Sequence, residues 1–284
     1  MNSRIIKSMD RIIDLALRED IGRGDITTDI FVPRTMFSKA KIIIHETATL
    51  AGLEVVKHVF KKLDKAVAVR TLFKDGDIVT KEKTVIEIRG KTKALLSGER
   101  VALNFLSHLS AIATNTTAFI QKVHPLQIQI VDTRKTTPGF RLLEKEAIRC
   151  AKGVNHRLDL NEMVLIKDNH HLISHLSITD MITKARNKTL KPIGIEVETI
   201  NDFTEAWAAK PHLILLDNMT ISQIKSAVRL ANNDPSKNKP ILEVSGGVTL
   251  RNIRAVAKTG IKRISIGALT HSKKAINISM EIII

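Results

Sequence analysis

Apolar residues recur at helical spacing in the first part of the chain and in short, strand-like runs later on. Residues 4–20 repeat apolar positions at helical spacing and are followed by Gly22, a helix stop signal. The next segment, GRGDITTD, is expected to be a polar loop. Further strands are expected at 39–45, 67–73 and 83–89, and further helices at 52–63 and 92–123, the last one broken near Ser97-Gly98. These elements predict a mixed α+β fold for the first third of the chain.

After about residue 125, short apolar runs alternate with helical stretches. The runs expected to be strands are 128–131, 163–166, 193–197, 213–216, 241–244 and 263–266. This alternation favours parallel βα units. The residues at or just past the strand ends are polar or glycine: Asp132, Lys167, Glu196, Asp217, Ser245 and Gly267. Because a β/α barrel gathers its active site at that end, the pattern predicts an incomplete, irregular barrel of about six strands. An open doubly wound sheet is the alternative, although the Gly-rich first loop typical of that fold is missing.

The last stretch, INISMEIII, alternates apolar and polar residues and is expected to be a half-buried strand that returns to the sheet of the first domain. The predicted fold class is therefore α/β, with an N-terminal α+β sandwich domain over residues 1–115 that is completed by residues 273–284. Residues 116–272 are predicted to form the barrel-like catalytic domain.

Composition narrows the class of protein. The 284 residues are 43% hydrophobic and 26% charged, which is ordinary for a globular chain. No apolar run is long enough for a membrane helix, and the N-terminus does not have the pattern of a signal peptide. The single cysteine, Cys150, excludes an intrachain disulfide and a multi-cysteine zinc site. A cytoplasmic protein is expected, with no membrane partner.

The charge is strongly positive, since 45 Lys+Arg face 29 Asp+Glu and give a net charge of +16. Nucleic acid, an acidic membrane surface and small polyanionic ligands are all compatible with that excess. An aromatic fraction of only 3% argues against binding single strands by base stacking. A basic nucleic-acid-binding protein is the second hypothesis, and it predicts affinity that falls steeply with salt. It does not explain carboxylates and glycines at successive strand ends, so no nucleic-acid partner is expected.

Cations cluster between Arg134 and Lys167. The segment DTRKTTPGFR follows a predicted strand and carries Arg134, Lys135 and Arg141. Guanidinium groups pair with planar carboxylates, whereas a lysine acts as a point charge for phosphate. A solvated basic loop would have the same composition, but Lys167 directly follows an apolar strand, where a surface lysine would be poorly placed.

Carboxylates and glycines end the later strands. Glu196 and Asp217 end consecutive strands and could hold Mg²⁺, directly or through water, or stabilise a developing positive charge. Alternatively, each caps the following helix or forms a local salt bridge. Two glycine-containing loops could bind phosphate through backbone N–H groups. They are the SGG loop at 245–247, which precedes a helix expected at 249–258, and the IGAL loop at 266–269, which has His271 nearby. No serine or cysteine nucleophile is evident, so phosphoribosyl transfer, aldol chemistry and phosphate-ester chemistry all remain open.

The ordered strings GERVALNFLSHLSAIAT, VDTRKTTPGFRLLEKEA, GVNHRLDLNEMVLIKDNH, IEVET, LILLDNM, EVSGGVTLRNI and SIGALTHS resemble the quinolinate phosphoribosyltransferase family. The resemblance runs from about Leu17 to the C-terminus. It implies transfer of phosphoribose from phosphoribosyl pyrophosphate to quinolinate with decarboxylation, which gives nicotinate mononucleotide, pyrophosphate and CO₂ in de novo NAD biosynthesis. It also implies Mg²⁺ and a homodimer with sites at the interface.

The resemblance assigns roles to individual residues. Arg134, His156 and Arg157 match positions that hold the quinolinate carboxylates, and Lys135 and Lys167 match positions that contact the phosphoribosyl donor. Glu196 and Asp217 match positions near the ribose and Mg²⁺, and together with Lys135 and Lys167 they form the expected catalytic set. Arg100 matches an arginine that reaches the neighbouring subunit's site. The expected substrate-binding set also includes Thr136, Ser245, Gly246, Gly247, Gly267, Ala268, Leu269 and His271.

The chain departs from the family pattern at two places. Glu146 stands where the family usually has tyrosine, and Ala151-Lys152 stands where it usually has a glycine pair. Both positions lie between motifs, so we expect them to change the shape of the connecting segment more than the chemistry of the site. A related branch associated with molybdenum transport operons shares the fold and is the nearest alternative, but its substrate loop departs from TRKTTPG.

Overall fold

The computed structural model describes residues 3–283, which form two compact units. The first unit contains the chain up to Thr117, together with Thr136–Lys152 and the residues from Leu269 onward. The second contains Ala118–Lys135 and Gly153–Ala268. The barrel domain predicted over 116–272 differs from the second unit mainly at Thr136–Lys152. This segment carries helix α5 (Arg141–Cys150), which contacts α1 (Ser3–Ile21) of the first unit.

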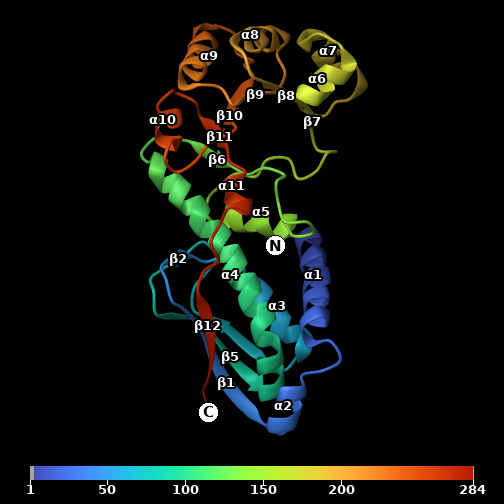
Figure 1. The fold of residues 1–284 in the computed structure, drawn as a ribbon, viewed down its shortest axis with the longest axis vertical. Helices are drawn as coiled ribbons and strands as arrows, with labels where there is room; N and C mark the ends of the chain where they lie inside the picture. The colour runs from blue at the N-terminus through green and yellow to red at the C-terminus, as the bar shows by residue number, and fades with distance from the viewer. Residues whose placement is uncertain (1–2, 284) are drawn as a thin grey trace. The chain divides into compact units, whose positions relative to one another are not determined.

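The first unit is built on a four-stranded antiparallel sheet in the order β12-β1-β5-β3 (Figure 1). Its strands are β1 (Phe37–Ile44), β3 (Ala68–Thr71), β5 (Lys83–Lys91) and β12 (Ile278–Ile283). Alternate residues of β1 and β5 point to a buried face, as the paired Ile42 and Ile86 do, while Lys39 and Arg89 pair on the exposed face. The predicted return of the C-terminal strand is confirmed, because β12 pairs with β1 over six residue pairs from Lys39↔Ile283 to Ile44↔Ile278. A small ribbon of β2 (Ala48–Thr49) and β4 (Ile78–Val79) completes the unit's strands.

Helices α3 (Leu53–Leu63) and α4 (Thr92–Val123) form much of the first unit's core. The expected break of α4 near Gly98 is wrong, since the helix runs through this position without interruption. A Cβ atom at Gly98 would lie 2.8 Å from Leu63 Cδ1 and 3.0 Å from Phe60 Cε1. The glycine therefore allows α3 to approach α4 closely, and a close approach needs no break in the helix.

The expected polar loop after α1 contains a short helix instead, α2 (Ile26–Phe31). Asp25 is its N-cap, and its carboxylate accepts hydrogen bonds from Thr28 N at 3.0 Å and Thr28 Oγ1 at 2.6 Å. Ser97 Oγ donates to the same carboxylate at 2.9 Å. This cap satisfies an N–H group that the first turn of the helix would otherwise leave without a partner.

The second unit is a six-stranded parallel sheet in the order β6-β11-β10-β9-β8-β7. The strands are β6 (Gln129–Val131), β7 (Val164–Ile166), β8 (Ile193–Val197), β9 (Leu213–Asp217), β10 (Ile241–Ser245) and β11 (Arg263–Ser265). All six predicted strands are therefore confirmed, each within two residues of its expected bounds. Consecutive strands from β7 to β11 lie side by side, and β6 joins beyond β11, which is the winding of an incomplete barrel. An isolated bridge, Val131↔Val154, extends the edge at β6.

Helices of the second unit follow its strands in the βα order. They are α6 (Asp168–Ser174), α7 (Ile178–Lys188), α8 (Ile200–Ala209), α9 (Ile221–Asn233), α10 (Ile253–Ala257) and α11 (Ala268–His271), the last of which extends into the residues of the first unit. The helix expected at 249–258 is shorter than predicted, because only Ile253–Ala257 is helical and a turn fills 250–252. Across residues 3–283, no helix is long and apolar enough to span a bilayer.

We expect Gly76→Ala to destabilise the first unit. Gly76 has φ +98°, and a Cβ atom there would lie 2.6 Å from the carbonyl oxygen of Cys150 at the end of α5. The left-handed backbone alone costs about 1–3 kcal/mol for a residue with a side chain, and the clash adds to it. Gly22→Ala is the control, because Gly22 also has positive φ but nothing lies within 4 Å of its Cβ position. Urea unfolding should show a larger loss for Gly76→Ala, and equal losses would contradict the packing argument.

Candidate active site

Lys167 and Glu196 meet at the ends of neighbouring strands in the second unit. Lys167 follows β7 and Glu196 lies in β8, and Lys167 Nζ donates to Glu196 Oε1 at 2.5 Å. The Glu196 side chain is only 16% exposed, whereas that of Lys167 is 40% exposed. Lysine therefore supplies the positive charge that neutralises Glu196, and it stays accessible to a negatively charged ligand.

Asp217 ends β9 and contacts the loop that follows β10. Ser245 Oγ donates to Asp217 Oδ1 at 2.7 Å, and Asn218 Nδ2 donates to Oδ2 at 2.9 Å. Neither Glu196 nor Asp217 caps a helix, because the side chains of Thr199 and Thr220 cap α8 and α9. The capping alternative for the two carboxylates is therefore excluded.

Arg157 and Arg134 bring two guanidinium groups near each other. Burial lowers the pKa of Arg157, and the positive charge of Arg134 lowers it further, while Glu196 and Asp159 act in the opposite direction. Arg157 Nη1 donates to the Met163 carbonyl at 2.8 Å, which fixes the side chain. A half-buried pair of like charges creates a strong positive potential, and a planar dicarboxylate suits such a potential well.

The DTRKTTPGF segment is held at both ends. Asp132 is fully buried after β6, and its carboxylate accepts a hydrogen bond from His156 N at 2.7 Å. In the first unit, the fully buried Glu144 accepts from Thr137 N at 3.2 Å and lies 2.8 Å from His108 Nε2. Burial acts to raise the pKa of Glu144, but these hydrogen bonds hold it below its ordinary value. The segment is thus anchored by two buried carboxylates.

The SGG loop has room on one side and close contact on the other. A Cβ atom at Gly246 would lie 2.1 Å from Asn218 Oδ1, so only glycine fits against the β9 loop. Gly247 has φ +59°, and nothing lies within 4 Å of its Cβ position. The backbone is therefore open to a ligand at Gly247. The short helix α10 begins only at Ile253, so the loop does not adjoin a helix N-terminus as expected.

Four expected site residues belong to the first unit. Arg100 lies on α4, Thr136 accepts a hydrogen bond from Arg141 Nε at 3.0 Å, Leu269 is buried in α11, and His271 Nδ1 lies 2.7 Å from Ser272 Oγ. The remaining expected residues lie in the second unit, where Lys135 is exposed and Gly267 and Ala268 follow β11.

Glu243 and Arg263 are the main residues that the sequence analysis missed. Glu243 is completely buried in β10 and accepts a hydrogen bond from Arg263 Nε of β11. Burial raises the pKa of Glu243, and the charge of Arg263 opposes that rise. An acidic residue two positions before Ser245 in an apolar strand was the available signal, since the period of two puts both side chains on one face.

The oxygen atoms of Glu196 and Asp217 fit magnesium chemically. Mg²⁺ prefers oxygen ligands and typically binds one or two carboxylates together with substrate phosphates and water. Among residues 3–283, no group of three or more His, Cys, Asp or Glu side chains could hold a metal ion. A magnesium ion would accordingly take most of its ligands from substrate and water, with Asp217 as its protein partner, because Glu196 already pairs with Lys167.

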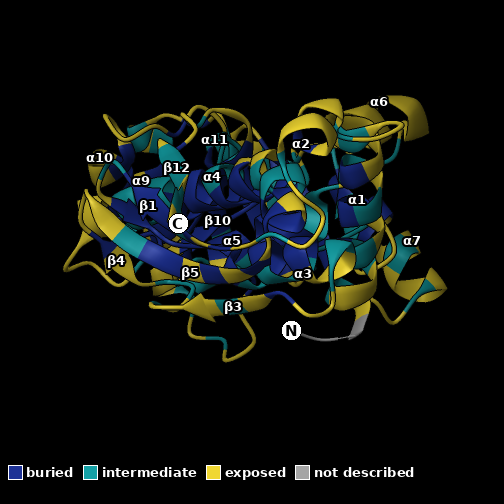
Figure 2. Cartoon of the chain, turned by 90° about the horizontal axis from the view of Figure 1, so that it is seen from below, coloured by how far each residue is buried: buried dark blue, intermediate teal, exposed yellow. Residues whose placement is uncertain are grey.

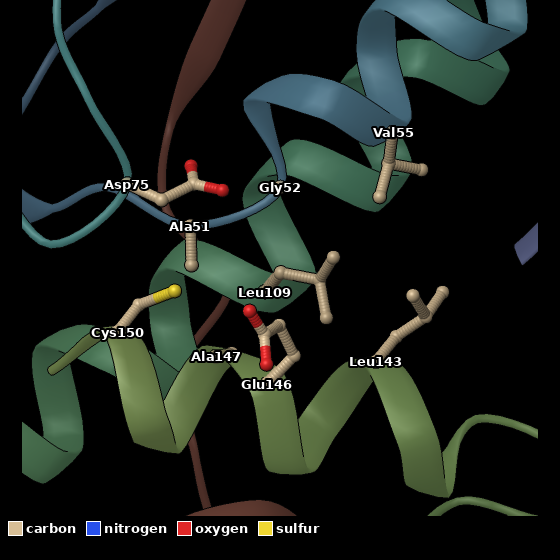
Figure 3. Close-up of a pocket in the computed structure, with 9 residues that line it drawn as sticks. All are labelled: Ala51, Gly52, Val55, Asp75, Leu109, Leu143, Glu146, Ala147 and Cys150. Atoms are coloured by element: carbon tan, nitrogen blue, oxygen red, sulfur yellow. The ribbon is translucent and has the colours of Figure 1, made fainter. Parts of the chain in front are cut away.

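Cys150 lies in a small pocket of the first unit that Figure 3 shows from inside. Burial raises the pKa of the thiol to about 12, with further contributions from the negative charges of Asp75 and Glu146. The thiolate is the nucleophilic form of cysteine, so this thiol is unreactive at neutral pH. Glu146, which replaces the tyrosine usual in the family, forms an ion pair with Arg149 at 2.5 Å beside the pocket. The raised pKa of Cys150 therefore argues against a role for this thiol as a nucleophile.

Two family models match the chain. The model described as "Quinolinate phosphoribosyl transferase, N-terminal domain" matches residues 25–110, and the one described as "Quinolinate phosphoribosyl transferase, C-terminal domain" matches residues 112–281. Together they leave residues 1–24, residue 111 and residues 282–284 outside the match.

Curated and solved relatives agree with these models. A Bacillus subtilis (strain 168) protein, named probable nicotinate-nucleotide pyrophosphorylase (carboxylating), is 39% identical over 277 residues, which cover 96% of this chain and 93% of that protein. The structure of NadC from Streptococcus pyogenes has a TM-score of 0.91 at 38% identity and covers 96% of this chain and 95% of its own. The nicotinate-nucleotide pyrophosphorylase from Francisella tularensis gives 0.92 at 35% identity, with 98% and 96% covered. These names do not favour the molybdenum-transport-associated branch. The chain belongs to the quinolinate phosphoribosyltransferase family.

Proposed function

We propose that the chain transfers phosphoribose from phosphoribosyl pyrophosphate to quinolinate and releases pyrophosphate and CO₂, giving nicotinate mononucleotide for NAD biosynthesis. The observation that carries this assignment is that the half-buried Arg157, fixed by its hydrogen bond to the Met163 carbonyl at 2.8 Å, lies near enough to Arg134 for their charges to repel. A ligand with two carboxylates relieves that repulsion. We also propose a cytoplasmic location, where a chain with one cysteine needs no oxidising environment.

Quinolinate binds, in this proposal, to the two guanidinium groups and to the segment that carries His156. Arg157 is fixed by its hydrogen bond to the Met163 carbonyl, so the guanidinium is oriented before the ligand arrives. Such preorganisation reduces the entropy that binding costs. Lys167 lies next to Glu196 at the neighbouring strand end and contacts both substrates.

The phosphoribosyl donor binds along the ends of β9, β10 and β11. Its phosphate groups meet the N–H groups of Gly246, Gly247 and Gly267, with Ser245 and Ala268 completing the phosphate loops of the second unit. Lys135 and Lys167 neutralise phosphate charge. Asp217 would hold a magnesium ion, which would supply charge neutralisation for the departing pyrophosphate.

The chemistry then follows from charge. As pyrophosphate leaves, positive charge develops on the ribose, and the carboxylates of Glu196 and Asp217 stabilise it. The pyridine nitrogen of quinolinate attacks the anomeric carbon and becomes positively charged. That ring nitrogen stabilises the carbanion left by loss of the adjacent carboxylate as CO₂, so decarboxylation requires no enzymatic base. The carbanion then takes a proton from solvent, which gives nicotinate mononucleotide. The residues of this chain chiefly bind, orient and exclude water.

A homodimer with shared sites is the proposed assembly. Arg100 is the residue expected to reach the partner's site. Helix α6 is exposed along its whole length, as its yellow colour in Figure 2 shows, and it carries Leu172 and Ile173 with 69% and 78% exposure. Helix α2 exposes Ile26 and Phe31, each at 75%. Large exposed apolar side chains in groups are typical of protein interfaces.

The direct test of the proposed reaction is to mix protein, quinolinate, phosphoribosyl pyrophosphate and Mg²⁺ and to measure nicotinate mononucleotide and CO₂. Nicotinate in place of quinolinate is the control, since it has one carboxylate fewer and cannot use both guanidinium groups. Turnover of nicotinate at the same rate, or no product from quinolinate, would refute the assignment.

We predict that Arg134→Ala and Arg157→Ala weaken quinolinate far more than the phosphoribosyl donor. Loss of a charge-assisted hydrogen bond in a desolvated site costs about 1.5–3 kcal/mol, which is roughly 10- to 150-fold in affinity. Calorimetric titration of both substrates measures the effect. Arg149→Ala is a control on α5, because Arg149 pairs with Glu146 on the surface. Equal losses for the two substrates would contradict the assignment.

We predict that Glu196→Gln and Asp217→Asn lower kcat. Each amide keeps the size of the side chain but removes the negative charge that stabilises the ribose in the transition state. The expected loss is on the order of 10²–10³, by analogy with removal of one preorganised electrostatic group. Quinolinate affinity should remain or rise, since its carboxylates lose a repulsive neighbour. Single-turnover rates decide the matter, and a variant with near-normal turnover would show that its carboxylate has another role.

We predict that two inactive variants complement each other. In a dimer that mixes Arg100→Ala with Lys167→Ala subunits, one site keeps both residues and the other has neither. Random exchange makes half of the dimers mixed, so about a quarter of wild-type activity should return. Each variant alone is the control. A monomer by light scattering at the assay concentration, or no recovery after proven exchange, would exclude shared sites.

A further inference from the structure

Glu243 is a buried carboxylate with two different neighbours in the second unit. Arg263 Nε donates to its Oε2 atom. Its Oε1 atom makes no hydrogen bond within the described part of the chain and lies 3.7 Å from His156 Nε2, at ion-pair distance. Glu243 is 0% exposed and the His156 side chain 8%. The reaction proposed above makes no use of Glu243.

The other atoms of His156 define its protonation. Its ring Nδ1 accepts a hydrogen bond from Arg157 N at 2.7 Å, so this nitrogen carries no proton. A neutral imidazole has one N–H group, and the proton must then reside on Nε2, which faces Glu243. The hydrogen-bond pattern thus assigns one tautomer.

Through this ring, the buried carboxylate reaches the backbone of Arg157. A carboxylate that faces an imidazole N–H fixes both the tautomer and the ring orientation, as such partners do for histidines in other sites. The ring in turn holds Arg157 N, while the Met163 carbonyl holds the guanidinium at 2.8 Å. Arg157 is therefore constrained at both ends of the residue.

We propose that Glu243 is a positioning residue for the quinolinate site, which it serves by holding His156 in the Nε2–H tautomer and thereby fixing Arg157. The proposal rests on the assignment of Arg157 to quinolinate. It makes His156 a link between a buried acid and an arginine, so its contribution to carboxylate binding is transmitted through Arg157. Glu243 touches no substrate in this scheme.

The variant Glu243→Gln separates this role from a merely structural pair with Arg263. Arg263 requires an acceptor, so the amide oxygen faces Arg263 and the amide NH₂ group faces His156. An NH₂ donor opposite Nε2 disfavours a proton there and shifts His156 toward the Nδ1–H tautomer, which competes with the Arg157 N–H group. We expect the quinolinate KM to rise roughly tenfold, as for loss of one hydrogen bond to a charged group. The KM for phosphoribosyl pyrophosphate and kcat should stay within about twofold of wild type, since neither involves this link.

The tautomer is measured directly, without substrate, by ¹⁵N NMR of histidine-labelled protein, with His156 identified from the signals lost in His156→Asn. Wild type should show neutral His156 with its proton on Nε2, and Glu243→Gln should shift it. The control is Asp75→Asn, a half-buried carboxylate that accepts from Leu53 N at 3.1 Å and belongs to the first unit, whereas His156 belongs to the second. It should lower thermal stability and leave the quinolinate KM unchanged.

Several results would overturn the proposal. If wild-type His156 carries its proton on Nδ1, the proposal is wrong, even if no variant folds. It is also wrong if folded Glu243→Gln keeps the wild-type tautomer, or if its KM values for quinolinate and phosphoribosyl pyrophosphate rise equally. The double variant Glu243→Gln/Arg263→Gln frees the amide to turn its oxygen toward His156, and it should restore the wild-type tautomer and the quinolinate KM. Because the NMR measurement needs no turnover, its failure is distinguishable from an absence of quinolinate phosphoribosyl transfer.

Discussion

The cost of burying charge governs the arrangement of the second unit. A carboxylate removed from water is stable only when an opposite charge or hydrogen-bond donors replace its hydration. Glu196 has Lys167, Glu243 has Arg263, and Asp217 has the hydroxyl of Ser245 together with the amide of Asn218. Each of these partners comes from the strand or loop next to the acid. The parallel sheet brings these groups together, because an acid on one strand lies beside a donor on the next strand or its loop.

Arg134 and Arg157 instead place two like charges near each other in the second unit. Burial and the charge of Arg134 lower the pKa of Arg157, while Glu196 and Asp159 act in the opposite direction. In the proposed function, these two charges and Lys167 at the end of β7 attract an anionic ligand. The positive charge of the whole chain has the same sign and would attract anionic substrates from a distance.

The strands and the overall architecture could be predicted from the sequence because apolar runs and their spacing are local signals. Residues that act through contacts with distant parts of the chain were harder to predict. Gly98 suggested a break, but its purpose is contact with Phe60 and Leu63 of another helix. Helix α2 was missed as well, although its cap at Asp25 is local, and Ser97 from far along the chain donates to the same carboxylate. Glu243 lies inside an apolar strand, where its partners Arg263 and His156 are not apparent from the sequence. The roles that motifs assign to individual residues stay predictions.

The pairing of β12 with β1 has a consequence for synthesis on the ribosome. The second unit consists of residues 118–135 and 153–268, so it is complete before β12 emerges. During that interval β1 presents an open edge with unpaired backbone groups, the kind of edge that recruits strands from other molecules. The charged Lys39 and Lys41 on its exposed face oppose such pairing. β12 therefore closes a sheet whose other strands leave the ribosome before it.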